Sequence, residues 1–268
     1  MESERRLFPG CRQSANNSEG REIFKSFQGN EFHFDCHKDI ACFTDCCSGL
    51  KLVLTPYDIL RIKNRLNLSS GDFLERYTET VFESPSQFPM VKLKMEEDEK
   101  AACPFVTKEG CTIYEDRPGA CRIYPLGRAA LKVDREKIAR EKFFIVNEAH
   151  CLGFQEPRRW TIEGWMANEG VDDYNSMNDQ WVEIITSQKC LGPDEDVRKK
   201  VQMFFMTSYN LDKFREFIFK SRFFERFEVP PDLREEMALD DAALIKFGFD
   251  WLKFSLFGEK MIQVQPRP

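Results

Sequence analysis

Apolar positions in the first half of the chain recur at helical spacing behind residues that favour a helix start. Thr55 is a good N-cap, and Pro56 suits the first turn of a helix. Ile59, Ile62 and Leu66 then share one helical face. The pattern predicts an amphipathic helix that begins at residue 56.

The same signals predict other elements along the chain. Further helices are expected after a cap at Ser69 or Ser70, after Pro118, after Thr161, over 132–142 and over 171–188. Short apolar or alternating runs predict strands near residues 52, 91, 101 and 143. We therefore expect a helix-dominated α+β fold, with a small core that a metal site pins and a few short strands.

The last third of the chain has a different, aromatic character. Twelve of the 25 phenylalanines lie between residues 204 and 257. Leu244, Phe247, Trp251 and Phe254 keep helical spacing, which predicts a C-terminal helical layer. Core packing explains these rings, and a docking surface for a protein substrate or partner is the alternative. The expected organisation is an arm at 1–30, a cysteine-cluster metal-binding domain at 31–155 and a helical region at 156–268.

Charge and composition narrow the class of protein. The chain has 268 residues and a formal charge of −6, without a long block of one sign, which argues against nucleic acid as a partner. It shows no secretory signal and no run of about 18 apolar residues, so we expect a cytoplasmic protein without membrane contact. In a reducing compartment, cysteines are better explained as metal ligands or redox thiols than as disulfides.

Eight of the ten cysteines fall into two blocks. The eight candidate metal ligands are Cys36, Cys42, Cys46, Cys47, Cys103, Cys111, Cys121 and Cys151. Thiolate suits zinc and iron–sulfur clusters, but these intervals match neither a zinc-finger knuckle nor a ferredoxin run. Because neighbouring side chains diverge in extended backbone, Cys46 and Cys47 can serve different centres. Eight ligands divide naturally into two four-coordinate sites.

Other histidines and cysteines near the blocks have more than one candidate role. His37 and His150 each adjoin a cysteine. Each could be a metal ligand, or instead a surface residue or a donor of a hydrogen bond to a ligand. Cys11 and Cys190 lie outside both blocks and are expected to be free thiols.

The order of the cysteine blocks, with Cys103-Pro-Phe, Cys111-Thr-Ile-Tyr, Arg117-Pro118 and Cys121-Arg122, resembles the YkgJ-type cysteine-cluster family. Members of that family are described as zinc- or iron-chelating proteins with eight characteristic cysteines. The resemblance covers about residues 33–155. The interval of five residues between Cys36 and Cys42 is longer than the two or three common in the family.

The resemblance implies metal chelation by all eight cysteines, with the metal ion or cluster as the partner. Arg117 and Arg122 are then expected to orient or neutralise the thiolates, or else to form surface ion pairs. One branch of the family is similar to flagellin lysine-N-methylases, which implies an iron–sulfur centre, S-adenosylmethionine and a substrate platform in the C-terminal layer. The chain shows no glycine-rich nucleotide-binding loop, so its status as an enzyme stays open. A metal-binding protein, a methylase-like enzyme and a metal carrier or redox sensor are the three hypotheses.

Overall fold

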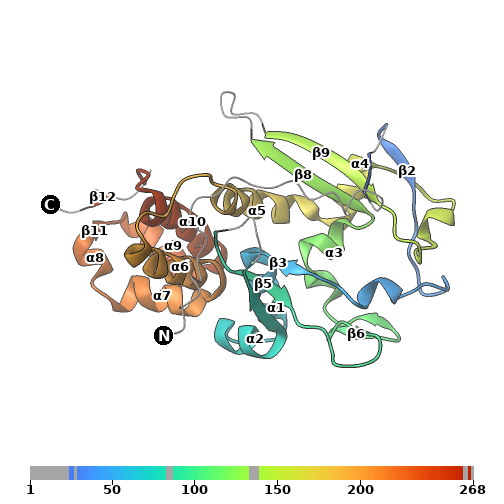
Figure 1. The fold of residues 1–268 in the computed structure, drawn as a ribbon, viewed down its shortest axis with the longest axis horizontal. Coiled ribbons are helices and arrows are strands. Elements are labelled where there is room, and N and C mark those ends of the chain that lie inside the picture. Colours follow the sequence, from blue (N-terminus) through green and yellow to red (C-terminus); the bar gives the residue numbers. More distant parts are fainter. Residues whose placement is uncertain (1–23, 27–28, 83–86, 133–138, 262–264, 267–268) are drawn as a thin grey trace, which may run out of the picture. The chain divides into compact units, whose positions relative to one another are not determined.

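The computed structural model describes residues 24–26, 29–82, 87–132, 139–261 and 265–266. The chain divides into two compact units. We call the unit formed by Ser18–Glu79 and Lys92–Gln180 the cysteine unit, and the unit that includes Thr80–Val91 and Trp181–Pro268 the helical unit. About 50% of the residues are helical and the strands are mostly short, which confirms the predicted helix-dominated α+β fold (Figure 1).

The cysteine unit contains several small antiparallel sheets. Its strands are β1 (Phe24–Ser26), β2 (Glu31–His33), β3 (Val53–Leu54), β6 (Val106–Thr107), β7 (Gly110–Cys111), β8 (Leu126–Lys132), β9 (Ala139–Val146) and β10 (Arg159–Thr161). β9 lies between β1 and β8, while β2 pairs with β10 and β6 pairs with β7. β4 (Thr78–Val81) and β5 (Met90–Leu93) lie where the chain passes between the units, and β5 pairs between β3 and β4.

The long pair of β8 and β9 corrects the helix predicted over 132–142 at residue 132 and over 139–142, while residues 133–138 lie outside the described part of the chain. Its register runs from Leu126 opposite Ile145 to Lys132 opposite Ala139. A Cβ at Gly127 would lie 2.1 Å from the ring of Phe144, so the glycine lets this ring cross β8. Pairing with β8 outweighs the weak helical propensity of the charged segment. Near residue 101, where a strand was also expected, an isolated bridge joins Ser48 to Ala102.

The predicted helix starts of the cysteine unit are confirmed. Its helices are α1 (Pro56–Arg65), α2 (Ser70–Tyr77), α3 (Gly119–Ile123), α4 (Ile162–Glu169) and α5 (Val171–Ile185), which continues into the helical unit. Thr55 and Asp58 form a capping box, in which the Thr55 hydroxyl accepts from the Asp58 N–H and the Asp58 carboxylate accepts from the Thr55 N–H. Ser69 and Thr161 cap α2 and α4 through their side chains.

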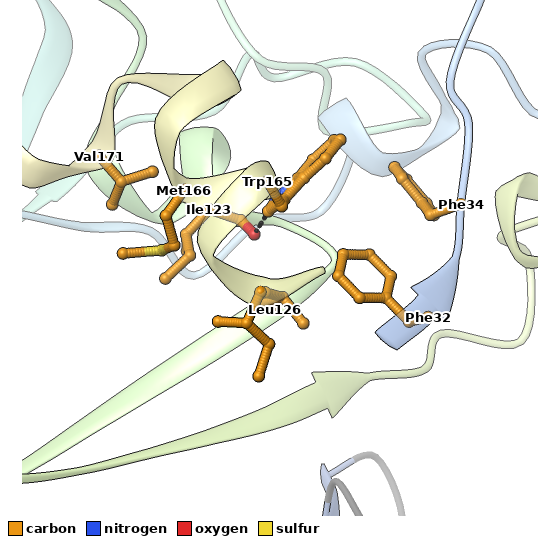
Figure 2. Packing of buried hydrophobic residues seen from close by; sticks show 8 residues of the cluster. Phe32, Phe34, Ile123, Leu126, Trp165, Met166 and Val171 are labelled. Carbon is orange, nitrogen blue, oxygen red and sulfur yellow. Dashed lines mark hydrogen bonds between the residues drawn. The ribbon is translucent and has the colours of Figure 1, made fainter. Parts of the chain in front are cut away.

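A hydrophobic core joins α3 and α4 to β2 and β8 (Figure 2). Trp165 packs edge-to-face on Phe32 and Phe34, with ring centroids 6.0 and 5.5 Å apart. Its indole N–H donates to the Ile123 carbonyl at 3.0 Å, so the buried ring leaves no unpaired donor. Cys151 packs against the edge of this cluster, which ties the core to the thiol site.

The helical unit packs its aromatic residues against one another. Its helices are α6 (Asp194–Tyr209), α7 (Leu211–Lys220), α8 (Phe223–Arg226), α9 (Pro231–Leu239) and α10 (Asp241–Phe257), with a short pair of β11 (Phe227–Glu228) and β12 (Gln265–Pro266). Leu244, Phe247 and Trp251 are buried, as core packing requires. A Cβ at Gly248 would lie 2.8 Å from the methyl of Thr207, so this glycine allows α10 to approach α6 closely. In the part of the chain that the structure describes, no helix is both long and apolar enough to cross a bilayer.

Candidate metal centre

The first cysteine block winds through a series of tight turns. In each of them a backbone N–H donates to the carbonyl three residues earlier, in the pairs Ile40 to His37, Phe43 to Ile40, Asp45 to Cys42 and Cys47 to Thr44. Thr44 has a left-handed backbone with φ of 71°, and the 3-10 helix Asp45–Cys47 follows it. These turns keep Cys42, Cys46 and Cys47 close together in a segment without a regular α-helix or long strand.

Long-range backbone bonds bring the later cysteines to this segment. The Cys103 N–H donates to the Cys47 carbonyl at 2.8 Å. Cys111 follows on the β6–β7 hairpin, and Cys121 lies on α3. The Leu152 N–H, next to Cys151, donates to the Cys42 sulfur at 3.2 Å. The two blocks, separated by more than fifty residues in the sequence, therefore meet in one region of the cysteine unit.

Two further sulfurs accept hydrogen bonds from the backbone two residues ahead. The Cys103 thiol accepts from the Phe105 N–H, and the Cys111 thiol accepts from the Ile113 N–H. Each of these bonds lowers the pKa of its thiol, although burial outweighs it and leaves both pKa values raised. Backbone N–H groups aimed at sulfur stabilise thiolates bound to metal.

Apart from Cys46, which neighbours thiols of both blocks, the electrostatic neighbours of the thiols fall into two sets. Burial raises the pKa of Cys36 to about 11, with further increases from Cys46, Cys42 and Cys151. Burial also raises the pKa of Cys121 to about 12, and Cys103 and Cys111 add to the increase. The first set is thus Cys36, Cys42, Cys46 and Cys151, and the second is Cys47, Cys103, Cys111 and Cys121.

Cys46 and Cys47 connect the two sets. A hydrogen bond between their side chains lowers the pKa of Cys46 and raises that of Cys47, so Cys46 is the sulfur that holds negative charge more easily. The charge of Cys46 also raises the pKa of Cys36, Cys103, Cys111 and Cys121. Cys46 therefore lies near members of both sets, whereas Cys47 neighbours Cys103 and Cys121 of the second.

All eight candidate cysteines are free thiols. Among the described residues, no three side chains of His, Cys, Asp or Glu already stand close enough together to hold one metal ion. Protonated thiols do not draw together, and a thiolate site closes when a cation replaces the protons. The donor set fits a thiophilic metal, because its raised pKa values come from burial and mutual repulsion that a cation would relieve. The ligand assignment itself stays a prediction.

Arg117 and Arg122 bind protein groups other than the thiols. The Arg117 guanidinium pairs with the Glu169 carboxylate and donates to the Tyr114 carbonyl, while its charge lowers the pKa of Cys111. Arg122 donates to the carbonyls of Glu115 and Glu169. Both arginines are 8% exposed, so they form buried structural links and are not the surface ion pairs considered from the sequence.

The two histidines beside cysteines face carboxylates at the surface. His37 Nε2 lies 3.7 Å from a carboxylate oxygen of Glu156, and His150 Nε2 lies 3.5 Å from one of Glu148. The side chains of His37 and His150 are 40% and 43% exposed. This favours surface or outer hydrogen-bonding roles over direct ligation.

The structure adds two residues that the sequence pattern did not single out. Glu169 lies 52 positions from its partner Arg117, and no local signal connects the two. Tyr124 follows α3, its hydroxyl is buried, and burial together with the neighbouring Cys151 raises the pKa of the phenol. Tyr124 follows the candidate ligand Cys121 by three residues, but no local pattern in the sequence relates it to Cys151.

Cys190 is disulfide-bonded, so its prediction as a free thiol is wrong. The expected reducing compartment disfavours disulfides for all cysteines alike. Cys190, however, belongs to the helical unit and not to the thiol cluster. Cys11 lies outside the described residues.

Comparison with known proteins identifies the region that carries the cysteines. A family model, CxxCxxCC, described as "Putative zinc- or iron-chelating domain", matches residues 35–152. The matched segment spans all eight candidate ligands and ends one residue after Cys151. No curated protein and no solved structure matches the chain.

Proposed function

Because residues 35–152 belong to the cysteine-cluster family of zinc- or iron-chelating domains, we propose that this protein holds two four-thiolate metal centres. The first centre takes Cys36, Cys42, Cys46 and Cys151 as ligands. The second takes Cys47, Cys103, Cys111 and Cys121.

The observation that carries this proposal is that the eight free thiols, apart from Cys46, which neighbours both, form two sets of electrostatic neighbours. Four sulfurs satisfy one tetrahedral zinc or one iron–sulfur cluster. Cys46 neighbours Cys36 as well as members of the second set, whereas Cys47 neighbours Cys103 and Cys121. The backbone bond from Cys103 to Cys47 holds the second set to the first block. One four-coordinate centre would leave half of these clustered thiols without a metal.

The chemistry of the donors suits both zinc and iron–sulfur clusters. Sulfur is a soft ligand for either, and N–H groups directed at Cys42, Cys103 and Cys111 support the negative charge that each centre would carry. The proposed function is therefore metal binding by thiolates. The metal and sulfide content of the purified protein identifies which metal is bound.

The test is metal and sulfide analysis of protein purified without oxygen. We expect two zinc ions per chain, or iron with matching sulfide for two clusters. Cys36→Ser removes a ligand from the first set and Cys111→Ser from the second, so each variant should lose about half of the bound metal. The double variant should lose nearly all of it.

The two single variants act as matched controls, because each leaves the other set intact. Wild-type metal content in both single variants contradicts the assignment of these ligands. Complete loss in either one shows a single shared centre instead of two.

A further inference from the structure

The disulfide at Cys190 sets this residue apart from the eight candidate metal ligands. The sequence has ten cysteines. Nine of them lie in the described part of the chain, where Cys190 is disulfide-bonded and the other eight are free thiols. None of these eight can be the partner of Cys190 within the chain. The sequence contains one further cysteine, Cys11.

The backbone on both sides of Cys190 is held in place. Cys190 lies in the helical unit, in the segment between α5 and α6. The side-chain amide of Gln87 donates to the carbonyls of Ser187 and Lys189, at 3.3 and 3.2 Å. On the other side of Cys190, Leu191 is buried. These contacts make the segment a defined attachment point for a second piece of chain.

Cys190 itself is exposed, although its neighbour Leu191 is buried. Exposed disulfides are reduced more readily than buried ones and are typical of regulatory sites. In the reducing compartment that we expect for this protein, a disulfide that does form is usually transient and senses the redox state. The exposure of Cys190 therefore favours a bond that opens and closes over a permanent structural one.

We propose that Cys11 and Cys190 form a reversible disulfide, which ties the start of the chain to the helical unit. In closing, the two thiols lose two protons and two electrons as the sulfur–sulfur bond forms. A small disulfide such as oxidised glutathione takes them up and is split into two thiols. Neither cysteine is a proposed metal ligand, so this redox pair is chemically separate from the metal centres and does not depend on them.

The experiment maps disulfides in metal-loaded protein that has been incubated with oxidised glutathione. The protein is quenched in acid, unfolded, blocked with N-ethylmaleimide and digested with trypsin without reductant. Trypsin releases Cys11 in the peptide 7–12 and Cys190 in the peptide 190–198. We expect mass spectrometry to find these two peptides linked. Dithiothreitol added before the blocking step should abolish the linked pair and leave both cysteines blocked.

Three cysteine variants serve as controls. Cys11→Ser and Cys190→Ser should each abolish the linked pair, because each removes one of its two sulfurs. Cys36→Ser is the matched variant, since Cys36 is also exposed but is a free thiol among the proposed ligands. We expect Cys36→Ser to form the linked pair to the same extent as wild type.

Four results would overturn the inference. The peptide 190–198 could be linked to a second copy of itself, to a peptide that carries one of the eight candidate ligands, or to glutathione alone. Cys190 could also stay a free thiol throughout the treatment. The metal content of the same sample tests the proposed function separately, because neither linked peptide contains a proposed ligand.

Discussion

Arg117 and Glu169 show how single residues support the thiol site without being part of it. Each side chain is about a tenth exposed or less, and the two charges pair directly. Arg117 also stacks on the Tyr114 ring at 3.7 Å from its centroid. Removing one partner of a buried pair leaves the other charge without compensation, which is more harmful than removing both.

Arg117→Met is therefore expected to lower the free energy of unfolding by about 3–5 kcal/mol. The reason is the uncompensated Glu169 carboxylate that remains in the interior. Urea unfolding of the metal-loaded protein, purified without oxygen, measures the change. Combining Arg117→Met with Glu169→Met should recover part of the loss, because no buried charge is then left unpaired.

Arg159 gives the exposed control for this prediction. Its pair with Glu31 has side chains that are 65% and 56% exposed, and the charged atoms are 3.4 Å apart. Solvent screens such a pair, so Arg159→Met should change stability by less than about 1 kcal/mol. Equal losses in the two variants would show that the burial of Arg117 is not what matters.

Between elements, Asp58 joins the start of α1 to the start of α3. Its two carboxylate oxygens accept from the Thr55 N–H and from the Gly119 N–H, each at 2.8 Å. Burial raises the pKa of Asp58, while these N–H donors and the charge of Arg122 oppose the increase. Because Cys121 lies on α3, this carboxylate positions the helix that carries a proposed ligand.

Asp58→Asn should lower the free energy of unfolding by about 1–3 kcal/mol. The amide can accept only one of the two hydrogen bonds and presents an NH2 group to the other buried donor. The matched variant is Asp72→Asn at the exposed start of α2, where the carboxylate accepts from the Ser69 hydroxyl. We expect Asp72→Asn to change stability by no more than about 0.5 kcal/mol, since surface substitutions seldom do more. A loss of similar size at both positions would contradict a special role for the bridge from α1 to α3.

Elements with strong local signals were predictable, and those that depend on distant partners were not. Thr55, Ser69 and Thr161 cap their helices as expected, because capping involves residues three positions apart. The segment 139–142 has helical composition but forms part of β9, since β8 offers a complete row of partners. Pairing with β8 therefore determines the conformation of this segment, and the local sequence pattern does not predict that pairing.

In the whole molecule, the thiols occupy one unit and the aromatic helices form the core of the other. Spacing alone identified the eight candidate cysteines. It could not divide them between the two proposed centres, because that proposal depends on contacts such as Cys103 with Cys47 and Leu152 with Cys42. The shared partner of Arg117 and Arg122, Glu169, was hidden for the same reason, because it lies 52 and 47 residues away in the sequence.

The separation into units predicts where metal removal should act. Metal bound by a structural thiolate site contributes about 10 kcal/mol to the folding of small domains. Chelation should therefore increase amide hydrogen exchange in the turns at 36–47, in the β6–β7 hairpin and in α3. The helices α6, α7 and α10 have their own buried aromatic core and should exchange at an unchanged rate. Restored protection after metal is added back is the control, and equal deprotection of both units would show that the metal stabilises the chain as one cooperative body.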